Sequence, residues 1–234
     1  LAPSISDRLE IMALNIERVG FAPNYVDYEE ALALQREVHQ AVAAEQKQNT
    51  VLLLEHQEVI TAGKRTEAHE YPHSDAVPVI KIDRGGKLTW HGPGQLVGYP
   101  IVKLPTVPID VVKHVRILEE IIINVLTGLG IHGERVDGRS GVWILGKDGV
   151  PDQKICAIGV RVSRRTTMHG FAINCNNNLD PFGQFIPCGI TDAGVTSISE
   201  QLGRNFEPIE LVDSLEAELL KYADQLGAQF EPHQ

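Results

Sequence analysis

Four runs of strand length follow one another in the middle of the sequence, and they restrict the fold more than any other feature. The runs cover residues 131–136, 141–145, 154–163 and 168–175. The tetrapeptide GKDG between the second and third runs is typical of a hairpin turn. Strands clustered in this way predict a sheet that is largely antiparallel or mixed.

Helical patterns precede these strands. Asp27 followed by Glu30 matches a capping box, and apolar residues then recur at helical spacing as far as about Glu45. Asp110 can cap a second helix over residues 111–129, whose apolar stripe predicts a buried face.

The remaining predicted elements are two strands over residues 50–55 and 79–83, a short helix over residues 197–202, and a last helix from Pro208 to about Gly227. Helices at both ends and in the middle, with strands clustered between them, favour an α+β fold. We expect a single domain over residues 1–234, in which helices flank a mixed, largely antiparallel sheet.

Composition limits the partners of the chain. Its 234 residues carry a formal net charge of −10 at pH 7, so its field repels nucleic acid and anionic lipid surfaces. No stretch approaches the roughly 20 apolar residues that span a bilayer. Three cysteines give no disulfide framework and fit a reducing compartment. We expect a cytoplasmic monomer that binds neither nucleic acid nor membranes.

The segment RGGKLTWHGPGQLVGYP, at residues 84–100, is rich in glycine. Glycine permits positive φ angles and lets the backbone approach a ligand closely, while Trp90, His91 and Tyr99 add a wall with polar groups. The segment matches neither the Walker pattern nor the dinucleotide fingerprint, so no phosphate cradle is predicted. On spacing alone, a ligand-binding segment and a glycine-rich double turn between strands are equal alternatives.

Cys188 is the candidate nucleophile among the three cysteines. It lies between a proline and a glycine in FIPCGIT, whereas Cys156 and Cys175 occupy strand-like runs that favour burial. On position alone, an inert cysteine is the alternative. The chain has no CxxC pair and no GxSxG elbow, so we predict neither a metal site nor a serine hydrolase.

Five segments together resemble one known family. They are EHQEVITAGKRT at residues 55–66, the glycine-rich segment 84–100, KICAIGVRVSR at 154–164, HGFAINC at 169–175 and PCGITDAGVTSI at 187–198. They closely resemble the lipoate-biosynthesis octanoyltransferases, also called lipoyl(octanoyl) transferases. The resemblance covers about residues 26–202 and implies the fold of the biotin and lipoate protein ligase catalytic domain.

The resemblance also implies a reaction and its residues. An octanoyl group would pass from octanoyl-acyl carrier protein to a lysine of the lipoyl domains of 2-oxoacid dehydrogenases and of the glycine-cleavage H protein, without a cofactor. Cys188 would form the acyl-enzyme, with Lys154 as its partner. The implied substrate-binding residues are Arg84, Gly85, Gly86, Lys87, Leu88, Thr89, Trp90, His91, Ala157, Ile158, Gly159, Gly170, Phe171 and Ala172.

Elementary chemistry suits this assignment. A nearby lysine favours the thiolate of Cys188, and Lys154 can then return the proton to the leaving thiol. The acyl chain needs an apolar slot, for which the expected wall residues are Val142, Ile158, Val160, Phe171 and Ile173. His56 and His91 are either substrate contacts or structural histidines.

Two other activities remain as alternatives. An ATP-dependent lipoate or biotin ligase shares the expected fold, but it needs a phosphate-binding loop and no catalytic cysteine. A non-catalytic protein that holds acyl carrier or lipoyl domains would tolerate the replacement of Cys188.

An acidic carrier protein requires a local basic surface on this acidic chain. The available residues are Lys64, Arg65, Arg84, Lys87, Arg139, Arg161, Arg164 and Arg165. Charge reversal at Arg164 and Arg165 is expected to slow transfer from the carrier protein and to leave a short synthetic thioester unaffected. An ordinary solvated surface is the alternative interpretation of these side chains.

Overall fold

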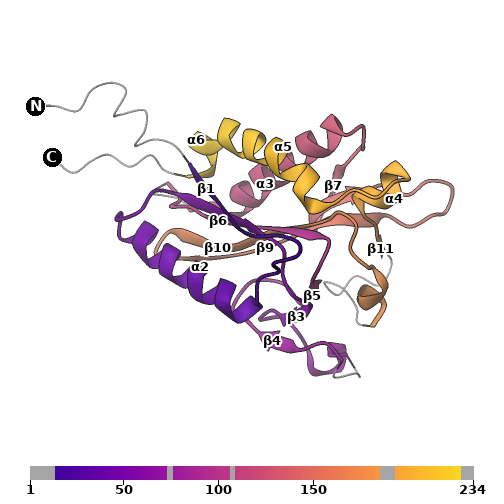
Figure 1. The fold of residues 1–234 in the computed structure, drawn as a ribbon, viewed down its shortest axis with the longest axis horizontal. Helices are drawn as coiled ribbons and strands as arrows, with labels where there is room; N and C mark the ends of the chain where they lie inside the picture. The colour runs from indigo at the N-terminus through magenta and orange to yellow at the C-terminus, as the bar shows by residue number, and fades with distance from the viewer. Residues whose placement is uncertain (1–13, 73–75, 106–108, 185–192, 228–234) are drawn as a thin grey trace, which may run out of the picture.

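A computed structural model of the chain describes residues 14–72, 76–105, 109–184 and 193–227. These residues form an eight-stranded sheet with helices on both faces and a three-stranded sheet beside it (Figure 1). The arrangement confirms the predicted α+β fold class.

The large sheet has the strand order β1-β2-β6-β10-β9-β8-β7, and β11 pairs with β9. Its strands are β1 (Asn15–Gly20), β2 (Thr50–Leu54), β6 (Gln95–Ile101), β7 (Glu134–Val136), β8 (Arg139–Ile144), β9 (Gln153–Ser163), β10 (Thr166–Asn174) and β11 (Gly194–Val195). β1 with β2 and β11 with β9 are parallel pairs, and the other pairs are antiparallel. The sheet is therefore mixed and largely antiparallel, as predicted.

The small sheet has the order β4-β3-β5 and lies on the α2 side of the large sheet (Figure 1). Its strands are β3 (Val59–Ala62), β4 (Val79–Lys81) and β5 (Leu88–His91). β3 pairs in parallel with β4 and antiparallel with β5.

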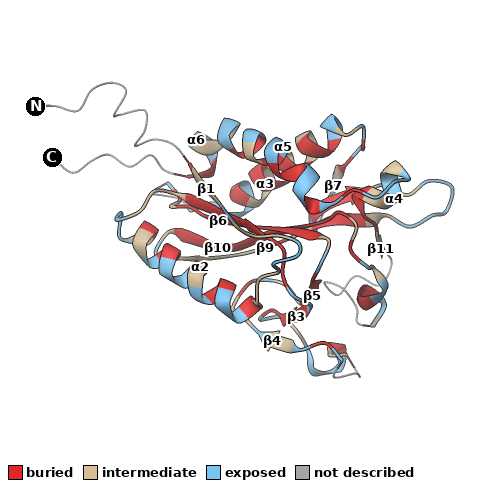
Figure 2. Cartoon of the chain, viewed as in Figure 1, coloured by how far each residue is buried: buried red, intermediate tan, exposed pale blue. Residues whose placement is uncertain are grey.

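Helix α2 (Tyr28–Ala43) covers one face of the large sheet, and α3 (Val111–Gly128), α5 (Pro208–Lys221) and α6 (Ala223–Leu226) cover the other (Figure 1). The buried residues concentrate where these helices face the strands (Figure 2). Along β2, Val51 and Leu53 belong to the core under α3 and α5, while Leu52 and Leu54 belong to the core under α2. This double burial explains why β2 is a continuous apolar run.

The predicted caps of the two long helices are present. The Asp27 carboxylate accepts hydrogen bonds from the backbone N–H groups of Glu29 and Glu30 at 2.8 and 3.1 Å. The Asp110 carboxylate accepts one from Lys113 N–H at 2.8 Å. Each cap satisfies amide donors that have no partner inside the helix.

Two expectations from the sequence need correction. The last helix is divided at Tyr222 into α5 and α6, because the backbone leaves helical geometry there. One interpretation of the glycine-rich segment was a double turn between strands. The segment instead contains strands β5 and β6, and β6 lies near the centre of the large sheet. No helix in the described part of the chain combines the length and hydropathy needed to cross a membrane.

Candidate active site

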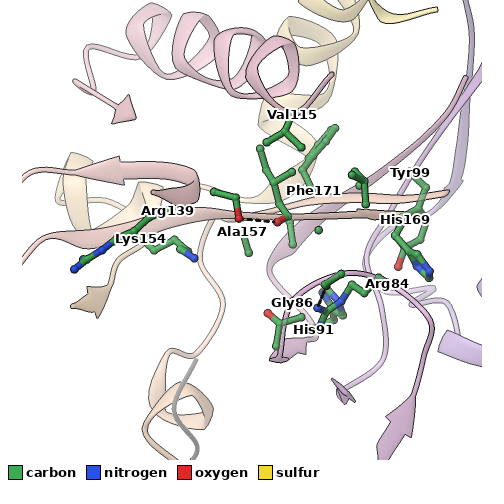
Figure 3. A pocket seen from close by; sticks show the side chains of 18 of the residues that line it. Arg84, Gly86, His91, Tyr99, Val115, Arg139, Lys154, Ala157, His169 and Phe171 are labelled. Atoms are coloured by element: carbon green, nitrogen blue, oxygen red, sulfur yellow. Dashed lines mark hydrogen bonds between the residues drawn. The ribbon is translucent and has the colours of Figure 1, made fainter. Parts of the chain in front are cut away.

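A cavity of about 370 Å³ lies over the middle of the large sheet, where β9 and β10 pair (Figure 3). In its floor, Gly159 is opposite Gly170 and Ala157 is opposite Ala172. The segment that leads into β5, and β5 itself, form a second wall. Further lining residues come from other elements and loops: Tyr28, Arg65, Tyr99, Val115, Gly138, Arg139 and Ser140.

Glycines in and beside the floor allow close packing of the strands. A Cβ atom on Gly98 would lie 2.1 Å from Cζ of Phe171, and one on Gly170 would lie 2.2 Å from the carbonyl oxygen of Gly98. Neither distance is compatible with the packing of protein interiors. A side chain at either position would displace Phe171 or the backbone of β6, and with it the shape of the cavity.

Arg84 closes the wall that faces Gly159. Its Nη2 group donates hydrogen bonds to the carbonyl oxygen and Oγ1 of Thr61 at 3.1 and 3.0 Å, and its Nη1 group donates to the carbonyl oxygen of Gly85 at 2.8 Å. The next turn requires Gly86, whose φ of 87° lies in the left-handed region that favours glycine. Arg84 is thus tied to β3 while its side chain covers the floor glycine.

Strand alternation divides the side chains of β5 between two environments. Thr89 and His91 line the cavity, whereas Leu88 and Trp90 pack in a separate apolar cluster with Phe182. This division follows from the two-residue period of a strand. Leu88 and Trp90 were expected to bind substrate, and the structure directs them away from the cavity.

Lys87, also an expected substrate-binding residue, does not line the cavity. Its ammonium group pairs with Glu70 at 2.5 Å and with Glu67 at 3.4 Å. The other expected substrate-binding residues all line it: Arg84, Gly85, Gly86, Thr89, His91, Ala157, Ile158, Gly159, Gly170, Phe171 and Ala172.

Lys154 projects into the cavity from the start of β9 (Figure 3). It is opposite Trp143 of β8 and beside Val195 of β11, so neighbours on both sides hold its backbone. Only 8% of the residue is exposed. Figure 3 shows Lys154 near one end of the cavity, and Tyr99 and His169 near the other.

Two buried imidazoles, of His91 and His169, line the cavity. Burial lowers the pKa of His91 to about 3 and that of His169 to about 4, so both are neutral at pH 7. The Nε2 atom of His169 lies 3.2 Å from a carboxylate oxygen of Asp83. His56 does not line the cavity and is structural, since its ring bonds to a backbone carbonyl and, at 2.6 Å, to Tyr99 Oη.

The candidate nucleophile, Cys188, falls in residues 185–192, outside the described residues. Cys156 and Cys175 are both buried, as expected, and burial raises the pKa of each thiol. A buried thiol of raised pKa is a poor nucleophile.

Of the expected wall residues, Ile158, Val160 and Phe171 line the cavity. Val142 and Ile173 are instead fully buried in the core beneath α3 and α5. Tyr99, which was expected in a wall, does line the cavity, and so does Arg139, which was expected on a basic surface. Sequence reasoning gave no role to four other lining residues, because separate elements contribute them: Tyr28, Val115, Ser140 and His169. His169 alone had a local signal, since it begins the segment HGFAINC.

The prediction of no metal site also assumed that no HExxH spacing occurs, and this was wrong, because HEYPH at residues 69–73 has the spacing of helical zinc sites. Here Ala68–Glu70 is a short 3₁₀ turn, and the carboxylate of Glu70 is bound to Lys87. His73 lies outside the described residues. Among the residues that are described, no three His, Cys, Asp or Glu side chains are grouped to hold a metal ion.

Comparison with solved structures places this fold among lipoate ligases. A lipoate-protein ligase A bound with ATP superposes with a TM-score of 0.67 at 13% identity, covering 94% of this chain and 88% of that one. A bipartite lipoate protein ligase from Thermoplasma acidophilum superposes with a TM-score of 0.65 at 13% identity, covering 93% of this chain and 87% of that one. At such low identity these comparisons show the fold alone.

Sequence comparison is more specific. Residues 27–220 match the family described as the lipoyl protein ligase A/B catalytic domain. The octanoyltransferase of Clavibacter sepedonicus is 56% identical over 211 residues, covering 89% of this chain and 90% of that protein. That of Acidothermus cellulolyticus is 57% identical over 197 residues, covering 84% and 88%.

The fold, the cavity and the family match define a catalytic domain of the lipoyl protein ligase A/B type. Within this class, the chain belongs to the octanoyltransferase family, whose members are acyltransferases.

Proposed function

We propose that this chain transfers an octanoyl group from octanoyl-acyl carrier protein to a lysine of lipoyl domains. The acceptors include the 2-oxoacid dehydrogenase subunits and the glycine-cleavage H protein, and Cys188 carries the acyl group as a thioester. The support for octanoyl transfer is the 56–57% identity to proteins named octanoyltransferases. The donor and the acceptors are those that the resemblance of the five sequence segments implies, and the covalent intermediate rests on that resemblance together with the chemistry of Cys188 and Lys154.

The position of Lys154 carries the proposal. An amine that lines a cavity, on a strand fixed from both sides, can exchange protons with groups bound there. Cys188 lies seven residues before Val195 in the sequence, and Val195 pairs with Lys154. Cys156 and Cys175 are buried with raised pKa values, which leaves Cys188 as the best candidate thiol.

The reaction then divides into two acyl transfers. The thiolate of Cys188, formed when Lys154 accepts its proton, attacks the thioester carbonyl, and the carrier thiolate leaves with a proton from Lys154. The acceptor lysine attacks the acyl-cysteine as a neutral amine, Lys154 accepts its surplus proton, and Cys188 departs as the thiolate. A thioester is exchanged for an amide, so the transfer requires no ATP.

The cavity suits the acyl chain because much of its surface is apolar. Ile158, Val160, Phe171 and Val115 lie along it, beside the low glycine floor. Burying the seven methylene and methyl groups of an octanoyl chain contributes about 5 kcal/mol, at roughly 0.8 kcal/mol for each group.

The test is the intact mass of the protein after mixing with octanoyl-acyl carrier protein in the absence of ATP. Wild type is expected to gain one octanoyl group that hydroxylamine removes. Cys188→Ser is expected to gain none, and Lys154→Ala to acylate slowly. Cys175→Ala is the matched control, because it removes a thiol that is remote from the solvent, and it should acylate as wild type does.

The opposite outcome would identify a ligase. If no variant is acylated, and a lipoyl domain is modified only when ATP and free octanoate are supplied, the thioester mechanism is excluded. Acylation of Cys188→Ser at the wild-type rate would contradict the assignment of the nucleophile alone.

A further inference from the structure

A chain of four hydrogen bonds connects the cavity to the backbone of Lys154. It begins at Nδ1 of His91, which lies 2.8 Å from Oε1 of Gln95. Nε2 of Gln95 lies 2.9 Å from Oδ1 of Asn174, and Nδ2 of Asn174 lies 2.9 Å from the carbonyl oxygen of Thr196. The N–H group of Thr196 then donates to the carbonyl oxygen of Lys154 at 3.1 Å.

The donor and the acceptor of each of these hydrogen bonds can be assigned by starting from the carbonyl oxygen of Thr196. The carbonyl of Thr196 can only accept, so the Asn174 atom that meets it must be the amide nitrogen. Oδ1 of Asn174 must then accept from the amide nitrogen of Gln95, and Oε1 of Gln95 must accept from His91. Nδ1 of His91 therefore carries a proton.

The five linked residues are enclosed by the protein. His91 is 7% exposed, Gln95 1%, Asn174 5%, Thr196 1% and Lys154 8%. A buried polar network of this kind has one favourable set of donors and acceptors, because an unmatched group inside a protein costs about 1–3 kcal/mol. The network thus selects one tautomer of His91.

We propose that Gln95 and Asn174 are positioning residues that hold His91 as a neutral imidazole with a bare Nε2 in the cavity. His91 then accepts a hydrogen bond from an N–H group of the bound substrate and cannot donate one. The same series of hydrogen bonds holds Thr196, the residue that follows β11, against the backbone of Lys154. This inference rests on the proposed transfer reaction and assigns a role within it to two residues outside the cavity lining.

The surroundings of His91 keep its ring neutral. Tyr28 stacks on it with ring centres 6.1 Å apart, and His56 lies at 5.7 Å. Arg84 and His169 are the other titratable groups that act on it in the described structure, and the positive charge of Arg84 opposes protonation of the imidazole. None of the described residues forms a hydrogen bond with Nε2, which leaves that atom for a ligand.

The direct test is a long-range ¹H–¹⁵N correlation spectrum of protein labelled with ¹⁵N-histidine, with His91 assigned from its absence in His91→Gln. The expected spectrum at pH 7 shows a protonated Nδ1 and a bare Nε2. An Nε2-protonated ring or an imidazolium would overturn the proposal. This measurement needs no turnover, so its result does not depend on whether the proposed reaction is correct.

The functional test is the pH profile of octanoyl transfer by Gln95→Glu. A carboxylate at this position still accepts from Nδ1, cannot donate to Oδ1 of Asn174, and stabilises the imidazolium. Beyond a loss that is common to all pH values, the variant should therefore lose a further roughly 10-fold in kcat/KM, relative to wild type, between pH 8 and pH 6. The Asn174→Asp variant cannot donate a hydrogen bond to the carbonyl oxygen of Thr196, so its kcat/KM should fall roughly 10-fold at every pH from 6 to 8. Asn176→Asp makes the same change two residues away and should leave kcat/KM unchanged.

Thermal unfolding of each variant separates positioning from folding. A loss for Gln95→Glu that is equal at pH 6 and pH 8, or that tracks a fall in melting temperature, would assign the network a structural role only and overturn the proposal.

Discussion

The ammonium nitrogen of Lys154 lies 4.6 Å from the centre of the Trp143 ring. Trp143 is opposite Lys154 in the pairing of β8 with β9, and only 1% of it is exposed. Among the described side chains, no carboxylate lies within 4.0 Å of this nitrogen. Within the described part of the chain, the aromatic face is therefore the attraction that holds the ammonium group in the cavity, and such contacts contribute about 0.5–2 kcal/mol.

Replacing Trp143 should slow acylation in proportion to the loss of aromatic surface. Trp143→Phe keeps an aromatic ring, and its acylation rate should fall about 3-fold. The acylation rate of Trp143→Leu should fall roughly 10-fold or more, as expected from the loss of a contact of about 1–2 kcal/mol. The measurement is the single-turnover rate of acyl-enzyme formation from octanoyl-acyl carrier protein.

Trp90→Phe is the control for this experiment. Trp90 is also buried but packs on Phe182, with ring centres 5.8 Å apart, and does not line the cavity. The Trp90→Phe variant should have a lower free energy of unfolding than wild type, and its acylation rate should stay within about 2-fold of wild type. Equal rates for Trp143→Leu and wild type would show that other groups hold Lys154.

The sequence predicted the long helices and strands β2, β4, β7, β8, β9 and β10 because their signals are local, whereas strands β1, β3, β5, β6 and β11 were not predicted. Asp27 and Asp110 cap their helices as expected, and the strands that became β8, β9 and β10 were recognised from short apolar runs. β6 was missed because glycine and proline, which disfavour strands in general, occur within it at Gly98 and Pro100. Gly98 is tolerated there because Phe171 fills the space over it.

The candidate site was predictable only in part. The motif resemblance indicated the floor around Gly159 and Gly170, which are opposite each other across β9 and β10. It did not distinguish Thr89 and His91 from Trp90, because the direction of each side chain depends on the register of β5.

The floor glycines give a stability prediction. Gly170→Ala should destabilise the protein by about 3 kcal/mol or more, since its Cβ atom would meet the backbone oxygen of Gly98, which cannot move without β6. Gly98→Ala should cost about 1–3 kcal/mol because its Cβ atom would meet a side chain and not the backbone, and Phe171 can swing away about its Cα–Cβ bond, which narrows the cavity. Urea unfolding measures both changes.

Gly128→Ala is the matched control for the glycine variants. Gly128 ends α3, and nothing lies within 4 Å of the position of an added Cβ atom. Alanine there should be neutral or raise the free energy of unfolding by about 0.5–1 kcal/mol. A destabilisation of Gly170→Ala no larger than the effect at Gly128 would contradict the packing argument.

Buried histidines predict a loss of stability in mild acid. Burial lowers the pKa values of four of them to between about 3 and about 4 in the folded state, and they are His56, His91, His114 and His169. The unfolded chain binds a proton at each near pH 6.5, so it holds more protons than the folded chain below that pH. The contribution of these histidines to the free energy of unfolding is fully present above pH 6.5. It falls as the pH approaches 4, by up to about 1.4 kcal/mol per pH unit for each histidine.

His114 offers a test of this linkage away from the cavity. It is buried in α3, so His114→Phe removes one titrating group and should reduce the slope of unfolding free energy between pH 6.5 and pH 5. His132→Gln is the control, because the side chain of His132 is 88% exposed and its loss should leave that slope unchanged. Equal slopes for wild type and His114→Phe would exclude His114 as a source of acid sensitivity.

The position of the basic residues gives a prediction about the acidic carrier protein. Arg65 is exposed and lines the cavity, and its backbone N–H donates to the carbonyl oxygen of Gly86 at 3.1 Å. Arg164 lies in the turn after β9, at the opposite end of that strand from Lys154, which is about 30 Å away at roughly 3.3 Å per residue. A docking surface around the cavity would therefore include Arg65 and exclude Arg164, which replaces the sequence-based prediction that Arg164 takes part in docking.

Charge reversal at these two arginines separates the alternatives. Arg65→Glu should lower kcat/KM for octanoyl-acyl carrier protein by roughly 5- to 30-fold at low ionic strength, with a smaller effect at high salt and little effect on a short synthetic octanoyl thioester. Arg164→Glu makes the same change in charge and should leave both substrates unaffected. An equal loss on the short thioester would mean that Arg65 acts within the cavity, because a docking defect is confined to the protein-bound donor. A loss at Arg164 alone would move the docking surface to the far end of β9, where the thioester could reach Lys154 only along the length of the sheet.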